Sequence, residues 1–469
     1  MILKQYYLQC LSQASYLIGD ETSGRAVVVD PRRDIEEYLR DAARLELCIE
    51  LVLETHFHAD FLSGHLEFAQ VGAEIGFGSH AHTEFPARLF DDGEHYSLGE
   101  VTLEVLHTPG HTPEAISIAI YETSESDHPH AVLTGDTLFV GDVGRPDLLV
   151  SAGWSKIELA GMLFDSIHEK LLSLPDETIV YPAHGAGSAC GKNLSNETWS
   201  TIGAQRSENQ SVRIRDRDEF IESITEGQPV QPMYFAYDAE LNGKVRPIRE
   251  QGQLKNLTAK QIKSVIEDGG AILDVRDPEI YALGHLLGSI NIGLDGRFAE
   301  FAGSVIDPAA PIVLCGAEKQ IVEARTRLSR IGYDQVRGAV LVEDCDPAAV
   351  NRTNRMTPSK LETLLKNNSS ISILDVRNAS EICDGFIEGS THIPLSSLTR
   401  RISEVPSGSE LVVYCAGGYR SSIAASLIRS VIPHIRVSDL VGGFSAWSEQ
   451  VQIDQAPYAT KPDSFCEMI

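Results

Sequence analysis

The first 200 residues alternate short apolar runs with amphipathic segments, a pattern typical of a layered α/β domain. The runs AVVVDP (26–31) and IELVLETH (49–56) have the length of buried strands, and DIEEYLRDAARL between them has the apolar spacing of a helix. Four more strand candidates follow: VTLEVLHTPG, AISIAIYE, HAVLTGDTLF and TIVYPAHG. Several of them end in His or Asp followed by Gly, Pro or Thr, which predicts polar groups on loops at one edge of a sheet.

The pattern changes near residue 226, and the chain is predicted to be an α/β multidomain protein. We predict a first domain over 1–225 and a linker over 226–257, a stretch rich in Pro, Gly and polar residues. Beyond it AILDVRDPEIYALGHLLGSINI is echoed by SILDVRNASEICDGFIEGSTHIPL. This repeat predicts two small α/β domains, 258–345 and 358–455, followed by a C-terminal tail over 456–469.

The composition, 42% hydrophobic and 23% charged, is that of an ordinary globular protein. The formal net charge of −28 argues against nucleic acid, which is bound through clustered Lys and Arg. No apolar run is long enough to cross a membrane and MILKQYYLQC lacks the features of a secretory signal, so we expect a cytoplasmic protein without a membrane partner. The eight Cys lack CxxC pairs, which indicates mostly reduced thiols. We also expect a homo-oligomer.

A set of His and carboxylate residues has the spacing of a metal site. In THFHADFLSGH, His56 and His58 project to the same side of an extended segment, with Asp60 close by. The motifs HTPGHT, LTGDTLF and YPAHG add three more candidates: His111, Asp136 and His184. One such His is usually structural, but four motifs in this order are hard to explain that way.

The order and wording of these motifs resemble the metallo-β-lactamase superfamily, whose fold is an αββα sandwich with the metal at one edge. In its two-metal hydrolases the residue after the Asp of the first motif is a His that binds the second metal. Here that residue is Phe61, which cannot ligate. The pattern is therefore similar to that of the persulfide dioxygenases, which oxidise the terminal sulfur of a thiol persulfide to sulfite.

This resemblance implies one Fe(II) per chain, held by His56, His111 and Asp136. Two His and one carboxylate with open positions are the donor set of non-haem iron enzymes that use O2. The remaining candidates are then groups that orient the ligands or carry protons: His58, Asp60 and His184.

Three residues near these motifs are candidates for handling the substrate. Arg145 in GDVGRPD could hold a carboxylate or phosphate of the thiol carrier, or form a structural salt bridge with Asp142 or Asp147. Cys190 lies close to Lys192, whose ammonium would favour the thiolate, so Cys190 could relay a persulfide. The alternative for Cys190 is a small buried apolar residue. Lys192, like Arg145, could meet a glutathione carboxylate or a coenzyme A phosphate.

The stretch VVYCAGGYRSSIAASLIRS predicts a strand, a tight loop and a helix. Gly417 and Gly418 let backbone N–H groups turn inward around Cys415, and Arg420 adds a full charge, which suits an anion or a persulfide. This resembles an active rhodanese domain, in which Cys415 would accept sulfur while Arg420 and the loop amides hold the oxyanion. Protein tyrosine phosphatases use longer loops between Cys and Arg, so the loop length favours sulfur transfer over hydrolysis of phosphate esters.

The first copy of the repeat departs from this pattern. CGAEKQI keeps Cys315 but lacks the glycine pair and the Arg, and it places Glu318 where an anion would bind. A carboxylate there would repel thiosulfate or sulfite. We predict an inactive rhodanese-like domain over 258–345.

The resemblance spans most of the chain and implies a persulfide dioxygenase fused to two rhodanese-like domains. Its partners would be O2, a small thiol persulfide such as that of glutathione or coenzyme A, and sulfite or thiosulfate, in sulfide detoxification or sulfur metabolism. Two alternatives remain open. One is a zinc-dependent thioester hydrolase like glyoxalase II with rhodanese domains attached. The other is a non-catalytic sulfur carrier whose metal is structural, closed by His58 or His184.

Overall fold

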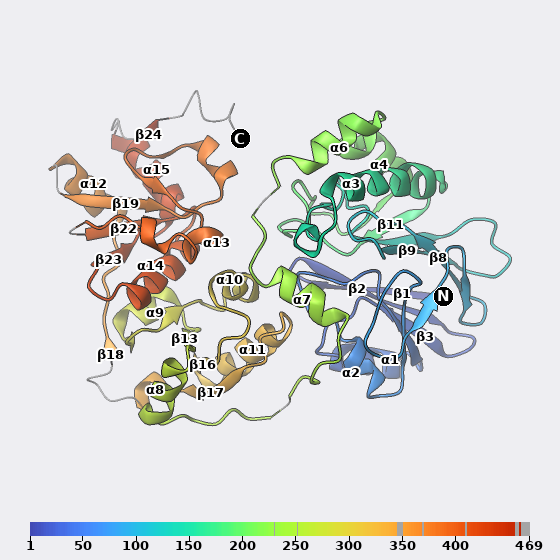
Figure 1. Cartoon of the computed structure of the whole chain (residues 1–469), viewed down its shortest axis with the longest axis horizontal. Coiled ribbons are helices and arrows are strands. Elements are labelled where there is room, and N and C mark those ends of the chain that lie inside the picture. The colour runs from blue at the N-terminus through green and yellow to red at the C-terminus, as the bar shows by residue number, and fades with distance from the viewer. Residues whose placement is uncertain are drawn as a thin grey trace. The chain divides into compact units, whose positions relative to one another are not determined.

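The computed structural model describes residues 1–228, 230–250, 252–344, 350–367, 370–408, 410–454 and 459–460. The chain divides into two compact units, one of residues 1–250 with 329–332 and one of residues 251–328 with 333–469 (Figure 1).

The first unit is a sandwich of two six-stranded sheets with helices on both outer faces, which confirms the predicted αββα fold (Figure 1). One sheet has the order β1 (Ile2–Leu8), β2 (Gln13–Asp20), β3 (Arg25–Val29), β4 (Cys48–Leu53), β5 (Glu74–Gly78), β6 (Arg88–Phe90). The other has the order β12 (Ser200–Thr201), β11 (Ile179–Pro182), β10 (Ala131–Gly135), β9 (Ile116–Tyr121), β8 (Thr102–His107), β7 (His95–Ser97). The helices are α1 (Glu36–Arg44), α2 (His65–Ala69), α3 (Lys156–Asp165), α4 (Ile202–Glu208), α5 (Gln210–Arg213), α6 (Arg217–Thr225) and α7 (Phe235–Asn242), with short turns η1 (Val150–Ala152), η2 (Ser166–Lys170) and η3 (Leu171–Ser173).

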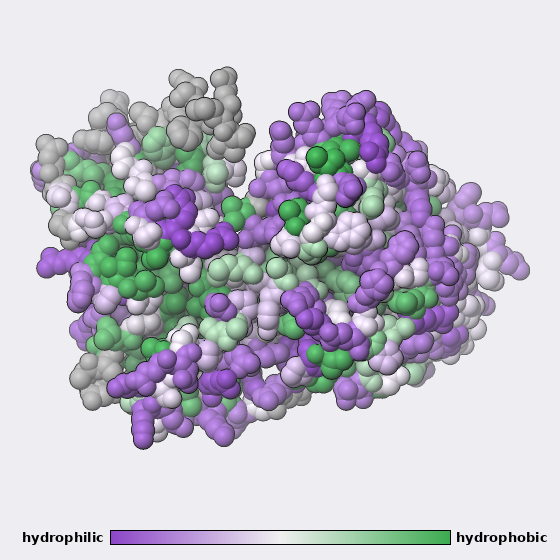
Figure 2. Space-filling view, in the orientation of Figure 1, coloured by the Kyte–Doolittle hydropathy of each residue, from purple (hydrophilic) through white to green (hydrophobic). Residues whose placement is uncertain are grey.

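The alternation of side chains along each strand explains these layers. In β3, Val27 and Val29 belong to the core between the two sheets, whereas Ala26 and Val28 pack in a separate cluster with Tyr38 of α1. A strand buried on both faces reads as a continuous apolar run, as AVVV does. The outer face of the second sheet likewise packs its apolar side chains against α3 and α6. The outer surfaces of these two helices are mostly hydrophilic in Figure 2.

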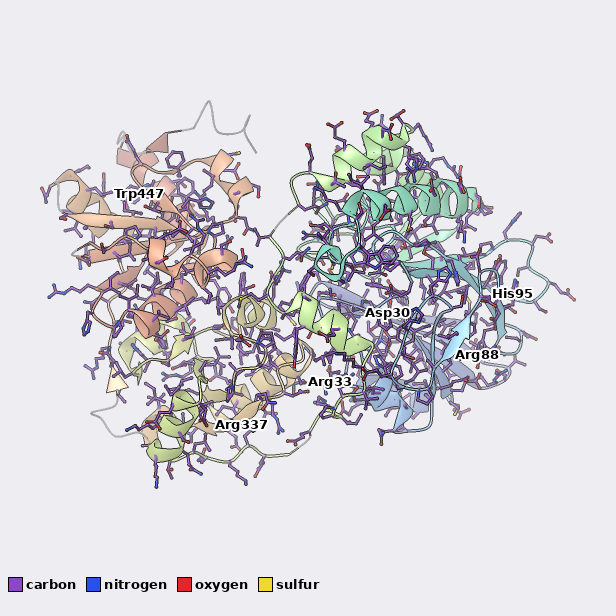
Figure 3. All side chains as sticks on the ribbon, viewed as in Figure 1. Asp30, Arg33, Arg88, His95, Arg337 and Trp447 are labelled. Carbon is purple, nitrogen blue, oxygen red and sulfur yellow. The ribbon has the colours of Figure 1, made fainter. Side chains whose placement is uncertain are left out.

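A buried ion network joins α2 to the loop after β3. Glu67 accepts hydrogen bonds from Arg33 (Nε–Oε1, 2.8 Å) and Arg246 (Nη1–Oε1, 2.9 Å; Nη2–Oε2, 3.0 Å). All three side chains are at most 4% exposed, and Arg33 is labelled in Figure 3. Burial alone would raise the pKa of Glu67, but the two guanidinium groups outweigh it and lower this pKa to about 2.

Replacing Glu67 by Gln should therefore destabilise the first unit by about 3–5 kcal/mol at pH 7, because two guanidinium groups lose their buried partner. The pKa of Glu67 is lower in the folded chain than in the unfolded chain. Its contribution is therefore complete above about pH 4.5 and is lost as the pH falls toward 2. Urea unfolding at pH 7 and pH 4, followed by hydrogen exchange of β3 and β4 peptides, measures both effects. The exposed Glu74→Gln is the control, and an equal loss in both variants would contradict the prediction.

The second unit contains two copies of one small fold, as the repeat predicts (Figure 1). The first parallel sheet has the order β15 (Ile290–Asn291), β13 (Ala271–Asp274), β16 (Ile312–Cys315), β17 (Val336–Val340). The second has the order β21 (Thr391–His392), β19 (Ile371–Asp375), β22 (Glu410–Tyr414), β23 (Val437–Asp439). Two-stranded pairs join β14 (His285–Leu286) to β18 (Val350–Asn351) and β20 (Phe386–Ile387) to β24 (Ala459–Thr460).

The helices of the second unit cover these sheets. They are α8 (Ala259–Glu267), α9 (Pro278–Leu283), α10 (Phe298–Val305), α11 (Glu318–Ser329), α12 (Pro358–Lys366), α13 (Leu395–Leu398), α14 (Tyr419–Val431) and α15 (Gly443–Asp454), with η4 (Val342–Asp344), η6 (Ala379–Asp384) and η7 (Ile402–Glu404). Trp447 of α15, labelled in Figure 3, is fully buried in the core of the second copy.

The repeated DVR motif makes the same contact in both copies. Arg276 Nη2 lies 2.6 Å from Asp274 Oδ2 and 2.8 Å from the Gly284 carbonyl. In the second copy, Arg377 Nη2 lies 2.6 Å from Asp375 and 2.8 Å from the Gly385 carbonyl. The motif therefore has a structural role. Its Arg connects the end of the first strand of each copy to the turn before the following strand.

The predicted linker contains α7, and β24 falls within the predicted tail, most of which lies outside the described residues. Within the described part of the chain, no helix combines the length and apolar character needed to cross a bilayer.

Candidate active sites

Four strand ends bring the predicted metal ligands to one edge of the sandwich. His56 follows β4 of the first sheet, whereas His111, Asp136 and His184 follow β8, β10 and β11 of the second. The loops therefore meet across the two layers, and His56, His111 and Asp136 offer ligand atoms that lie within 4.8 Å of one another.

The geometry of these three residues fits a metal ion. Asp136 Oδ2 lies 3.4 Å from His111 Nε2 and 3.9 Å from His56 Nε2, and all three side chains are at most 2% exposed. Neither oxygen of Asp136 nor Nε2 of His111 has a hydrogen-bond partner among the described residues. Buried polar atoms are almost always satisfied, so these convergent unsatisfied atoms are suited to bind a cation.

The other ring nitrogens orient the two His ligands. His111 Nδ1 lies 2.8 Å from the carbonyl oxygen of Arg145, which can only accept, so Nδ1 carries the proton and Nε2 is free to ligate. His56 Nδ1 lies 3.0 Å from Thr55 Oγ1. Burial lowers the pKa of both His, and the neutral form is the one that binds metal.

His58, Asp60 and His184 form a second buried group beside the first. His184 Nε2 lies 3.4 Å from Asp60 Oδ2 and 3.5 Å from Asp136 Oδ1, and its Nδ1 lies 3.1 Å from the Ser12 carbonyl. The three ligand atoms of His58, Asp60 and His184 again lie within 4.8 Å of one another. This group can orient the first site or hold an ion itself.

The cysteine loop of the second unit lies between β22 and α14. The N–H of Gly418 lies 3.1 Å from Cys415 Sγ, and the Ser421 hydroxyl lies 3.6 Å from it. Gly418 has φ +100°, which favours glycine, whereas a side chain at Gly417 would meet open space. The Gly418 N–H of this loop is therefore a hydrogen-bond donor to the sulfur. Of the two glycines, only Gly418 has a backbone conformation that requires glycine.

A second glycine pair lies against the cysteine loop, and the sequence analysis did not predict this contact. The N–H of Phe444 lies 2.7 Å from the Cys415 carbonyl and that of Ser445 lies 3.0 Å from the Ala416 carbonyl. A side chain on Gly443 would collide with both carbonyls. The start of α15 thus binds the loop's carbonyl oxygens, and the signal in the sequence was the glycine pair of VGGF (441–444).

Arg420 forms a two-pronged ion pair within the same copy. Its Nη1 and Nη2 lie 2.6 and 2.7 Å from the two oxygens of Glu381 in η6. An oxyanion bound by Arg420 would therefore have to share the guanidinium group with Glu381 or displace the Glu381 carboxylate. In the first copy Ile280 stands where Glu381 does, and Gln320, which binds its own loop at Ala317 N (3.0 Å), stands where Arg420 does.

Comparisons with known proteins identify the families of the domains that carry these two sites. The description "Metallo-beta-lactamase superfamily" matches residues 8–184, and "Rhodanese-like domain" matches 258–338 and 357–450. Human mitochondrial "Persulfide dioxygenase ETHE1" is 32% identical over 189 residues, which span 39% of this chain and 68% of that protein. The chain belongs to the metallo-β-lactamase superfamily and carries two rhodanese-like domains.

Two other relatives show the breadth of this superfamily. "Hydroxyacylglutathione hydrolase cytoplasmic" of Arabidopsis thaliana is 34% identical over 186 residues, 39% of this chain and 67% of that protein. A crystal structure of a "Metallo-beta-lactamase" from Staphylococcus aureus is 34% identical, with a TM-score of 0.66, and covers 73% of this chain and 99% of that one. A relative named as a persulfide dioxygenase and one named as a hydroxyacylglutathione hydrolase therefore match at similar identity.

Phe61 distinguishes this metallo-β-lactamase domain from the H-x-H-x-D-H pattern of two-metal hydrolases. Its ring is 1% exposed, and its centroid lies 4.3 Å from that of His58. The main-chain oxygens of His58 and Phe61 both accept from Asn242 Nδ2, at 2.8 and 2.9 Å. An apolar ring is thus fixed beside the second group of ligand atoms.

Arg145 forms the salt bridge with Asp147 that is one of its two predicted roles. Its Nε and Nη2 lie 2.7 and 2.8 Å from the two oxygens of Asp147, and its Nη1 lies 3.0 Å from the Ala189 carbonyl. The side chain is only 1% exposed. These contacts are those of the structural salt bridge, and they hold the Arg145 carbonyl against His111.

Gly144, the residue before Arg145, packs against the main chain of Asp136 and the ring of His111. A Cβ there would collide with the Asp136 carbonyl and lie 3.1 Å from His111 Nδ1. We expect Gly144→Ala to lower metal affinity by about 10–100-fold, the range seen when groups that orient ligands are disturbed. Metal content after dialysis against a chelator measures this. Gly417→Ala is the control, because a Cβ there meets open space and the residue lies in the second unit. Unchanged retention by Gly144→Ala would contradict the prediction.

Cys190 is buried, as one of its two predicted interpretations expects. Burial and the carboxylates of Asp60 and Asp136 raise the pKa of Cys190 to about 12. Lys192 Nζ instead donates to main-chain carbonyls, at 3.0 Å from Ser223 O. These contacts do not support thiolate formation through Lys192. The Cys190 sulfur nevertheless lies with Asp136 and His184 in a group of potential ligand atoms within 4.8 Å.

Sequence reasoning missed the carboxylates behind the site. Asp30 accepts from the Thr55 N–H (2.7 Å) and hydroxyl (2.8 Å) and lies 3.1 Å from His58 Nε2. Asp30 directly follows β3 and has φ +50°, an unusual conformation for a residue with a side chain. Figure 3 labels it within the first unit. Glu114 accepts from the Phe57 N–H at 2.9 Å. An acidic residue at a strand end was the available signal.

Proposed function

We propose that the chain oxidises a low-molecular-weight thiol persulfide with O2 at the site of His56, His111 and Asp136, and transfers sulfane sulfur at Cys415. The observation that supports it most is the three-ligand cluster, with its unsatisfied buried atoms, next to a fixed phenyl ring. Two His and one carboxylate fit Fe(II), which would supply activation of O2 when bound.

The residues of the chain contribute orientation and the exclusion of water. The Arg145 carbonyl fixes the ring of His111, and the Asp147 salt bridge fixes Arg145 in turn. Phe61 places an apolar surface beside His58, where a hydrolase would need a second ligand. His184 Nε2, between Asp60 and Asp136, is placed to carry a proton.

The proposed oxidation balances without another co-reactant. One thiol persulfide, one O2 and one water give the thiol, sulfite and two protons. The terminal sulfur loses the electrons that O2 gains, and the sulfur–sulfur bond breaks with its pair remaining on the thiol. The carrier thiol in this proposal is a small one, such as glutathione or coenzyme A, in the cytoplasm.

The second reaction takes place at Cys415. The Cys415 thiolate attacks the outer sulfur of thiosulfate, the sulfur–sulfur bond breaks, and sulfite leaves with the electron pair, so that a persulfide remains on Cys415. Cys415 can also take the outer sulfur of a second thiol persulfide: its thiolate attacks that sulfur, the sulfur–sulfur bond breaks, and the thiol leaves with the electron pair. The sulfite made at the first site then attacks the outer sulfur on Cys415 and leaves as thiosulfate, which restores the thiolate. The Gly418 N–H, 3.1 Å from Sγ, stabilises the anionic sulfur in both directions. Covalent linkage of the domains raises the effective concentration of sulfite.

A second candidate is a zinc-dependent thioester hydrolase. Two observations favour it: the additional group of His58, Asp60 and His184, whose ligand atoms lie within 4.8 Å, and the similarity to a hydroxyacylglutathione hydrolase. Two adjacent metals would supply the hydroxide for such a reaction.

A product analysis separates the two candidates. The full chain, loaded anaerobically with Fe(II), is given glutathione persulfide in air, and the chain loaded with Zn(II) is given S-lactoylglutathione. The proposal predicts sulfite and thiosulfate from the first mixture and negligible thiol release from the second. Thioester hydrolysis by the zinc form, without sulfite from the iron form, would favour the hydrolase instead.

A further inference from the structure

The helix that follows the cysteine loop packs one polar face on the first rhodanese-like copy. Tyr419, Ser422 and Ser426 of α14 are three and seven residues apart and so lie on one side of the helix. The Ser422 hydroxyl lies 2.9 Å from Asn291 Oδ1, and the Asn291 N–H lies 2.9 Å from Ser426 Oγ. Asn291 lies at the end of β15 in the first copy.

Tyr419 extends this contact into the cysteine loop itself. It is the residue directly after Gly418, and its hydroxyl donates to the Gly293 carbonyl. A Cβ on Gly296 would lie 3.0 Å from Tyr419 Cζ, so the ring lies directly against that glycine. The ring of Phe301 lies 5.6 Å away.

The surface that receives Tyr419 is itself held in place. Arg327 Nη1 of α11 lies 2.8 Å from the Leu294 carbonyl, within the segment that Tyr419 contacts. Asn291 Nδ2 donates to the carbonyls of Asp274 (3.1 Å) and Arg276 (2.8 Å), so its Oδ1 is the atom available to Ser422. The hydrogen bonds of Asn291 and Gly293 thus hold the first turns of α14 in place against the first copy.

We propose that the first rhodanese-like copy, whose own loop is unsuited to anions, positions the catalytic loop of the second copy through Tyr419. By anchoring this residue, it holds the adjacent Gly418 N–H on Cys415 Sγ. Tyr419 is therefore a positioning residue. This inference rests on the proposed sulfur transfer at Cys415, and it assigns a task to a domain that carries no catalytic loop of its own.

The test uses the full chain and two substitutions on opposite sides of the contact. Tyr419→Phe removes the hydroxyl, and Gly296→Ala adds a methyl against the ring in the other copy. We expect each to lower kcat for sulfur transfer from thiosulfate to cyanide by about five-fold, the effect of one lost hydrogen bond, with little change in KM for thiosulfate. The double variant should lose no more than the stronger single one, because both act on one contact.

A second readout does not depend on the proposed activity. The rate of alkylation of Cys415 by iodoacetamide at fixed pH, read from the Cys415 peptide by mass spectrometry, should fall in step with kcat. Lys319→Ala is the matched control, because Lys319 is exposed and takes the place of Tyr419 in the loop of the first copy. It should change neither quantity.

The two hypotheses can fail separately. Without sulfur transfer by the unmutated chain, the proposed reaction at Cys415 fails, yet the alkylation rates still test the positioning role. If Cys415 is alkylated as fast in Tyr419→Phe and Gly296→Ala as in the Lys319→Ala control, the inference is overturned. Additive losses in the double variant would also contradict it, since the two sites would then act independently.

Discussion

Asp136→Asn should lose the bound metal and, with it, the O2-dependent reaction. Asp136 supplies the only carboxylate in the group of His56, His111 and Asp136, and both of its oxygens lack a hydrogen-bond partner within the described residues. An amide is a weaker ligand and brings no charge to balance a cation. Disturbing groups that merely orient ligands costs about 10–100-fold in affinity, so loss of a ligand should cost at least a hundred-fold.

Metal content per chain after anaerobic loading and desalting measures this directly, and O2 uptake with glutathione persulfide gives the functional counterpart. His95→Ala is the control, because His95 is an exposed residue of β7. Sulfur transfer from thiosulfate to cyanide should survive in both variants. Full metal retention by Asp136→Asn would contradict the assignment of the ligands.

Cys415→Ser should abolish sulfur transfer while the oxidation of persulfide continues. A serine hydroxyl in the same loop still meets the Gly418 N–H but cannot carry a persulfide. Loss of a catalytic nucleophile typically costs at least about a thousand-fold in rate. The reaction mixture should then accumulate sulfite, with no thiosulfate formed by the enzyme.

The matched control is Cys315→Ser, the equivalent residue of the first copy. Cys315 is buried at the end of β16, and the loop that follows it carries the exposed Glu318 instead of a glycine pair. We expect sulfur transfer by this variant to equal that of the unmutated chain. A comparable loss in both variants would show that the two copies act together in the chemistry.

The layered fold and the clustering of His56, His111 and Asp136 could be predicted because they depend on local patterns. Runs such as AVVV identify strands buried on both faces, and a His or Asp directly after a strand falls at the sheet edge whatever the details of packing. The H-x-H spacing of His56 and His58 likewise needs only the geometry of an extended chain.

The supporting contacts could not be predicted, because each joins residues far apart in the chain. Asn242 binds the main chain of His58 from 184 positions away, within a stretch predicted to be a linker. Arg145 had several possible partners in sequence, and only the folded loop shows that Asp147 takes its guanidinium. The pairing of Arg420 with Glu381 is similarly invisible in the spacing of either motif.

The most direct test of the account is O2 uptake by the full chain, loaded anaerobically with Fe(II) and given glutathione persulfide, measured for the unmutated chain and for Cys415→Ser. We expect Cys415→Ser to consume one O2 per persulfide and to form sulfite alone. The unmutated chain should consume between one-half and one O2 per persulfide, because it passes part of the outer sulfur to sulfite and so forms thiosulfate. Absence of O2 uptake with both glutathione persulfide and coenzyme A persulfide would contradict the account.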